Sequence, residues 1–309
     1  MHHASLITNP DGTALSLSLF LDSLIRSLEV GSLYALMAVG LTLTMAVIKL
    51  PNFAHAELIT TGAYAALAVA LLVTNNPVLV VGGAFGAGGL VALLCHWAVY
   101  RPLAARKLST YTMILASFAV GLILRYLFFF VVDRYKLFEK RIAVPQEVWF
   151  QSDLITLTNI FFWVLPISLG LVLVLTLLLT ATPLGRQMRA LADNEMLAKV
   201  IGLPVRRIQA MTWLLVGGLA GAAGALWGLY TNVHPLTGWL AILSVFAATV
   251  LGGMTSFPGT ILGAYIVAFA ENVGMQALNS WFGVDFSVKP AVPFIIIILV
   301  LLLRPKANH

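Results

Sequence analysis

The residues of this chain that could do chemistry are a few polar and ionisable side chains within long apolar stretches. Such groups are costly at membrane depth, and they are usually paired or functional. Placed there, they can couple to protons or ions, or line the path of a polar solute. We therefore treat the following residues as candidates for a pathway or gate: Asn52, His55, Glu57, Arg125, Ser244, Thr249 and Glu271.

The densest of these motifs runs from Asn52 to Glu57, directly after Lys49 and Pro51. Proline suits the first turn of a helix, and a glutamate suits its positive N-terminal end. Two interpretations stay open. The motif is either a structural network at a helix start, in which His55 is hydrogen-bonded, or a direct part of gating or passage.

A metal site or a catalytic site is not favoured by these residue types. His55 and Glu57 are too few to hold a metal, and the sequence does not place His96 or His234 beside them. The single cysteine, Cys95, excludes a disulfide framework and a thiolate cluster. Since no nucleophile–base pair stands out either, we expect no metal, no cofactor and no enzyme activity.

A polar segment, 182–207, separates two long uncharged stretches. No Asp, Glu, Lys or Arg lies between Asp153 and Arg186, or between Arg207 and Glu271. A membrane protein that exposes such a segment on its positively charged side offers a docking surface. A channel driven by a separate cytoplasmic motor would need one.

Within this segment the sequence predicts a short capped helix over about 194–201. Asp193 or Asn194 can cap its start, Gly202 can adopt the left-handed conformation at its end, and Pro204 prevents continuation. Its apolar residues recur on one face at helical spacing. The residues that we expect to meet a motor protein are Glu195, Met196, Leu197, Val200, Ile201 and Gly202.

The composition predicts a membrane protein. Of 309 residues, 60% are hydrophobic and 10% are charged, and the mean hydropathy is +0.97. Soluble domains carry about a quarter charged residues. In a membrane protein, a net charge of +6 mostly reflects Lys and Arg in the cytoplasmic loops. The positive charge therefore does not indicate nucleic-acid binding.

Apolar segments of spanning length recur along the chain. We expect an all-α bundle forming one transmembrane domain over 1–309, with about eight spans and a short broken or re-entrant helix, 238–252. The residues before Gly31 include Asp22, Arg26 and Glu29, which predict a short amphipathic helix at the interface or a tilted first span. The expected spans are 31–48, 54–73, 77–99, 111–132, 158–181, 208–230, 259–278 and 289–304.

Glycine spacing and two irregular stretches give further predictions about the bundle. Glycines recur at spacings of three and four in 77–99 and 208–230, which predicts close helix packing, with a sliding gate as the alternative. Two irregular stretches, 232–238 and 252–259, flank a helix predicted over 239–251. That helix is about 20 Å long, short of a core of roughly 30 Å, so we expect it to be re-entrant and to border a pathway.

Basic residues set the expected orientation. The loop 133–157 mixes both signs of charge and is placed outside. The C-terminus and the polar segment 182–207 are placed in the cytoplasm. The residues that mark the cytoplasmic side are Arg101, Arg106, Lys107, Arg186, Arg189, Lys199, Arg206, Arg207, Arg304 and Lys306.

An ordered set of motifs covers nearly the whole chain. With these motifs, and with the Asn52–Glu57 motif, the sequence resembles the branched-chain amino-acid ABC permeases of the LivH type. The motifs are Gly31-Ser32-Leu33-Tyr34-Ala35-Leu36, Gly40-Leu41-Thr42-Leu43, Gly62-Ala63-Tyr64, Tyr100-Arg101-Pro102-Leu103, Thr182-Pro183-Leu184-Gly185-Arg186, Leu251-Gly252-Gly253, Phe257-Pro258-Gly259 and Leu303-Arg304-Pro305.

The resemblance implies a permease subunit of an ABC importer in the inner membrane. It implies a second related permease, two cytoplasmic subunits that bind ATP, and an external solute-binding protein. It also implies that 182–207 contains the coupling helix. Ala56 replaces the glycine usual in the motif, Arg125 is an unexpected charge, and the loop 133–150 is longer and more charged than usual.

The implied substrates are branched-chain or other small neutral amino acids. Permeases for urea or short-chain amides share most of these motifs and are the alternative. A stand-alone secondary transporter, with Glu57, Arg125 and Glu271 coupling ions, is a further alternative. No glycine directly precedes any lysine, so the chain has no Walker A loop and cannot supply the ATPase itself.

Overall fold

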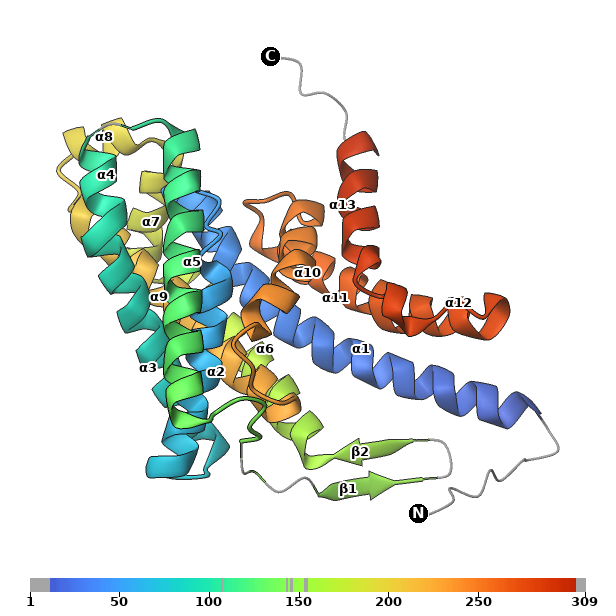
Figure 1. The fold of residues 1–309 in the computed structure, drawn as a ribbon. Helices are drawn as coiled ribbons and strands as arrows, with labels where there is room; N and C mark the ends of the chain where they lie inside the picture. Colours follow the sequence, from blue (N-terminus) through green and yellow to red (C-terminus); the bar gives the residue numbers. More distant parts are fainter. Residues whose placement is uncertain (1–11, 107, 143, 145–146, 153–154, 304–309) are drawn as a thin grey trace.

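The computed structural model describes residues 12–303 of the chain, apart from residues 107, 143, 145–146 and 153–154. Lys107, Arg304 and Lys306, which mark the expected cytoplasmic side, lie outside the described residues. The described chain is almost wholly helical (Figure 1). Its long helices are α1 (Gly12–Leu43), α2 (His55–Leu72), α3 (Pro77–Cys95), α5 (Thr110–Tyr135), α6 (Asn159–Ala181) and α9 (Val205–Tyr230).

The remaining elements are shorter. The helices are α4 (Arg101–Ala105), α7 (Pro183–Asp193), α8 (Glu195–Val200), α10 (Thr237–Leu251), α11 (Phe257–Phe269), α12 (Met275–Phe282) and α13 (Ala291–Leu303). Three π-helical turns, η1 (Thr44–Ile48), η2 (His96–Tyr100) and η3 (Ala270–Gly274), continue α1, α3 and α11, and η4 (Phe286–Val288) is a 3₁₀ turn. Two short strands, β1 (Val148–Gln151) and β2 (Thr156–Thr158), pair antiparallel.

Seven helices within the described residues are long and apolar enough to cross a membrane, in agreement with the predicted polytopic all-α bundle. The last predicted span, 289–304, is the 13-residue α13, which is about 20 Å long. It starts late because Lys289 and Pro290 form a turn. The seven helices are Leu17–Ile48, His55–Leu72, Pro77–Ala105, Thr110–Tyr135, Asn159–Ala181, Val205–Tyr230 and Phe257–Phe282.

The residues before Gly31 do not form a separate amphipathic helix. They are the first part of the 32-residue α1, which crosses the bundle obliquely in Figure 1. The structure thus corrects the first interpretation of this segment and favours the tilted span. The helix continues through Asp22, Arg26 and Glu29, and these residues line a partly open cavity of about 540 Å³.

The helix α9 is the centre of the bundle and packs along α2 and α3. Glycines bring these backbones into direct contact. A Cβ at Gly217 would overlap the backbone of Gly88, and a Cβ at Gly62 would overlap that of Gly221. The close packing predicted from the glycine spacing is therefore confirmed.

The predicted helix between the two breaks is confirmed as α10, Thr237–Leu251. The loop before it contacts the predicted external loop, where the amide of Val233 donates to the carbonyl of Lys140 over 2.9 Å. The turn after it packs near the end of α1, where the hydroxyls of Thr42 and Thr260 lie 2.8 Å apart. The start of α10 thus lies near the predicted external loop, and its end lies near α1 and α11.

The β1–β2 hairpin and the helix α7 are among the elements that the sequence did not predict. The hairpin runs from the loop 133–157 to Thr158, at the bottom of Figure 1. The helix α7 precedes α8 in the polar segment, so this segment holds two helices rather than one. The side chain of Thr182 caps α7 by accepting from the amide of Gly185 over 3.1 Å.

Candidate functional site at the junction of α2, α5 and α10

A network of polar contacts fixes the start of α2 deep inside the bundle. Lys49, in the left-handed conformation, ends η1, and the chain then runs without regular structure to α2. The side-chain oxygen of Asn52 accepts from the amide of Ala54 over 3.1 Å and from the hydroxyl of Tyr100 over 3.2 Å. The amide of Phe53 donates to the hydroxyl of Ser117 over 3.2 Å. Asn52 therefore holds the helix start in place.

His55 is buried in this network and faces α1. Its Nε2 lies 2.9 Å from the carbonyl oxygen of Met37. Since a carbonyl only accepts, Nε2 donates in this contact, and Nδ1 has no partner among the described residues. Gly40 leaves room for the ring, because a Cβ there would lie 3.1 Å from its Cε1. The predicted hydrogen bond of His55 is confirmed.

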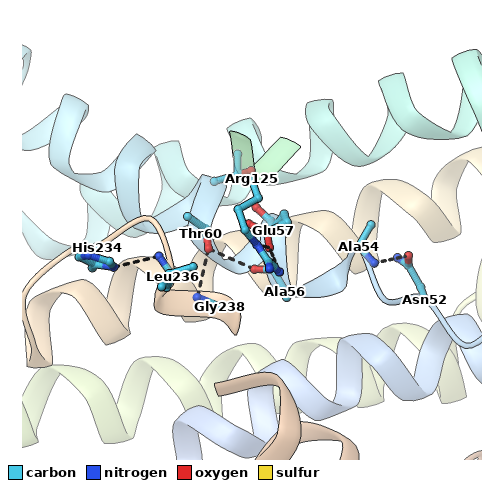
Figure 2. Close-up of polar contacts among 10 residues, drawn as sticks. Asn52, Ala54, Ala56, Glu57, Thr60, Arg125, His234, Leu236 and Gly238 are labelled. Atoms are coloured by element: carbon cyan, nitrogen blue, oxygen red, sulfur yellow. Dashed lines mark hydrogen bonds and ion pairs between the residues drawn. The ribbon is translucent and has the colours of Figure 1, made fainter. Parts of the chain in front are cut away.

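Glu57 forms an ion pair with Arg125 between α2 and α5 (Figure 2). Nε and Nη2 of Arg125 both donate to Oε1 of Glu57, over 2.8 and 2.7 Å. The guanidinium also lies over the ring of Trp239, 4.0 Å from its centre. The side chain of Glu57 is 0% exposed and that of Arg125 is 13% exposed. Arg125 thus points into the bundle, where its partner is Glu57.

The start of α10 is fastened to α2 at the same junction. The hydroxyl of Thr60 donates to the carbonyl of Ala56 over 3.3 Å and accepts from the amide of Gly238 over 3.1 Å (Figure 2). A Cβ at Gly238 would overlap the Ala56 carbonyl, so the close approach requires glycine. In the preceding loop, Nδ1 of His234 accepts from the amide of Leu236 over 3.1 Å.

A second polar cluster surrounds Glu271, which lies in η3. Its Oε2 accepts from the hydroxyl of Tyr34 over 2.9 Å, and its Oε1 accepts from the hydroxyl of Ser244 over 2.5 Å. Turns of π-helix within longer helices are frequent at functional sites. Ser244 and Glu271 therefore meet, whereas the hydroxyl of Thr249 donates to the carbonyl of Val245 within α10. The pathway candidates form two clusters rather than one.

The short helix α8 agrees closely with its prediction. The side chain of Asn194 caps it by accepting from the amide of Leu197 over 3.0 Å, and Gly202 has a φ of +78°. Ala198 is buried beneath it, and Glu195 forms an exposed ion pair with Lys199. Its apolar face is open, with exposed fractions of 75% for Met196, 56% for Leu197, 81% for Val200 and 62% for Ile201.

The two loops predicted to be cytoplasmic lie at one end of the molecule. A cavity of about 710 Å³ brings Arg101 of the first loop together with Arg206 and Arg207 of the second. Glu195 and Lys199 of α8 line the same cavity. The exposed apolar face thus stands beside a concentration of positive charge, at the upper left of Figure 1.

Several residues of the two clusters escape sequence reasoning. The sequence around Trp239 indicates only that it follows the irregular stretch 232–238. Thr60 lies in a helical stretch without a motif that would mark it as functional. Tyr34 and Tyr100 occur in family-like motifs, but nothing in those motifs assigns partners to them. Within the described residues, no group of three or more His, Cys, Asp or Glu could hold a metal ion.

Comparison with known proteins gives the family. The family model described as "branched-chain amino acid transport system / permease component" matches residues 23–301. The chain belongs to this permease family. The junction and the Glu271 cluster are thus features of a permease in a membrane, and the LivH-type resemblance of its motifs is confirmed.

Individual relatives are similar to this permease over most of its length. It is 32% identical over 280 residues to the probable branched-chain amino acid transport permease protein LivH of Methanocaldococcus jannaschii, which covers 89% of this chain and 87% of the relative. It is 27% identical over 300 residues to LivH of Escherichia coli K12, covering 93% and 94%. The ribose import permease RbsC of the same organism is 27% identical over 302 residues, covering 93% and 86%. These relatives are named as transport proteins and not as enzymes.

Proposed function

We propose that this permease is the transmembrane subunit of an ATP-driven importer. It passes branched-chain or other small neutral amino acids from an external binding protein into the cytoplasm, in the inner membrane. Its partners are a second, homologous permease subunit and two cytoplasmic ATPases. The observation that carries this proposal is the exposed apolar face of α8 beside the basic end of the molecule.

The face of α8 is suited to a protein groove. Three large apolar side chains of the six-residue helix, and that of Ile201 directly after it, are open to solvent, while Ala198 is buried. Burying such a face stabilises a complex by about 25 cal/mol per Å² of apolar area, before the costs of association. The surrounding basic residues support a cytoplasmic position for this end, and Arg304 and Lys306 in the sequence support the same side for the C-terminus. Because the chain lacks a Walker A loop, the motor must come from a partner.

We place the solute pathway along the starts of α2 and α10. Both helices begin inside the bundle, and irregular backbone at membrane depth is tolerated where it is buried in protein or lines a cavity. At this junction the charges of Glu57 and Arg125 cancel, and Asn52 and Glu57 each keep one buried polar atom without a partner among the described residues. A path with cancelled charge suits a solute of zero net charge.

The proposal is tested by reconstituting the permease into liposomes with its partners and the binding protein. We expect uptake of labelled L-leucine with ATP inside the vesicles, and loss of uptake when the ATPase cannot hydrolyse ATP. Uptake that persists with such an ATPase under an ion gradient would favour a stand-alone secondary transporter. ATP-driven uptake of urea or a short-chain amide, without leucine uptake, would favour the alternative substrate class.

A further inference from the structure

A polar cavity of about 290 Å³ lies between α1, the η3–α12 segment and η4. It is separate from the junction of α2, α5 and α10. Its apolar wall includes Leu19 and Phe286. Its charged and amide side chains are Asp22, Arg26, Glu271, Asn272, Gln276 and Lys289.

The charges of this cavity are balanced in number and are not paired with one another. Two are positive, Arg26 and Lys289, and two are negative, Asp22 and Glu271. Within the part of the chain that the structure describes, none of these four side chains forms an ion pair. Lys289 donates instead to the side-chain oxygen of Asn272 over 2.9 Å. Glu271 and Lys289 interact electrostatically without forming an ion pair. Two charges of each sign in one small cavity favour a ligand that carries both signs.

We propose that this cavity binds the zwitterionic head of an amino acid on its way into the permease. Arg26 and Lys289 receive the α-carboxylate, and Asp22 and Glu271 receive the α-ammonium group. Leu19 and Phe286 contact the apolar side chain. The volume is close to the lower bound of about 300 Å³ for small-molecule pockets, which suits one amino acid. This inference rests on the proposed function and names the charge class of its substrate.

A neighbouring cavity supplies an approach to this site. It has a volume of about 540 Å³ and shares Asp22 and Arg26 with the smaller cavity. It adds one charge of each sign, Glu29 and Arg141, and reaches Thr156 of the β1–β2 hairpin. The same balance of charge therefore extends from the hairpin to Glu271, along one side of α1. A sugar or urea can hydrogen-bond to these side chains, but neither carries a formal charge that would neutralise them.

Glu271 is held in a fixed position for this role. Tyr34 and Ser244 each donate to one of its oxygens, so the carboxylate cannot rotate without losing both bonds. Two hydroxyl donors keep its negative charge solvated without cancelling it. The carboxylate therefore stays available to a positively charged ligand group.

The test measures binding of labelled L-leucine to the purified transporter in nanodiscs, without the binding protein. The competitors are leucinol, which lacks the carboxylate, and 4-methylpentanoate, which lacks the ammonium group. We expect each to compete at least about tenfold more weakly than leucine, since a hydrogen bond to a charged group is worth this factor or more. Absence of leucine binding, or equal competition by all three, would overturn the inference.

Variants of Arg26 and Lys289 test whether these two cations receive the carboxylate of the ligand. Arg26→Gln and Lys289→Gln should each weaken leucine binding about tenfold or more and leave leucinol binding unchanged. A merely structural role would weaken both ligands alike, and that result would also overturn the inference. Arg134→Gln, an exposed cation outside both cavities, is the matched control. If a variant fails to fold, the competition series on the native protein decides alone.

The inference and the proposed function can fail separately. ATP-driven leucine uptake without charge-selective binding at this cavity would overturn only the inference. Charge-selective binding without ATP-driven uptake would overturn only the proposed function.

Discussion

At the scale of single residues, the pair of Glu57 and Arg125 explains why a charge is tolerated in α5. The two residues are 68 positions apart in sequence, and each would be costly alone in a low-dielectric interior. Paired, they satisfy each other, and the ring of Trp239 covers the guanidinium. The pair thus joins three helices at one point.

Removing one partner of this pair should be far more harmful than removing both. Arg125→Gln leaves a buried carboxylate alone, so we expect a loss of about 3–5 kcal/mol of folding stability, and a similar loss for Glu57→Gln. The double variant should recover much of this loss, because no uncompensated charge remains. Thermal unfolding of the detergent-purified permease measures the effect, with Lys136→Gln as an exposed control. Equal destabilisation by single and double variants would contradict the pairing.

At the scale of elements, local sequence signals predicted helix boundaries well, whereas contacts between residues far apart in sequence were not predicted. The boundaries of α8 and α10 follow from residues close in sequence, such as the cap at Asn194 and the glycines after Leu251. The partner of Arg125 and the link between Tyr34 and Glu271 depend on packing across 68 and 237 positions, which no local pattern encodes. The sequence left an interfacial helix and a tilted first span open before Gly31, because Asp22, Arg26 and Glu29 are compatible with both.

The apolar face of α8 should transmit the state of the ATPase. Leu197→Asp places a charge where we propose that a groove closes, so we expect stimulation of the ATPase by substrate-loaded binding protein to be lost. Folding should be unaffected, since the side chain is exposed. Leu197→Met keeps an apolar contact and is the control. Normal transport by Leu197→Asp, measured in the reconstituted system, would show that this face is not the docking surface.

At the scale of the whole molecule, the two ends differ in character. One end carries α8, α4 and the basic cavity, and the other carries the β1–β2 hairpin. The charge-balanced cavities lie along the part of α1 away from the basic end. This asymmetry is consistent with the one-way import that we propose.

This polarity predicts opposite accessibility at the two ends of α10. In a background with Cys95 replaced, an impermeant thiol reagent should label Asn232→Cys from outside and Ser256→Cys from the cytoplasmic side. Both positions are exposed. Asn232 neighbours the contact of Val233 with the predicted external loop, and Ser256 neighbours the turn that packs near the end of α1. Labelling of both from one side would support the re-entrant description of α10.

The glycine contacts between α9 and its neighbours also have a mechanical meaning. Where backbone touches backbone, no side chain can change rotamer to absorb a shift, so α2, α3 and α9 should move only as one rigid body. The helices α5, α6 and α8 make much less extensive contact with this block. If the proposed motor drives transport, we therefore expect its stroke to displace these outer helices against a stationary frame.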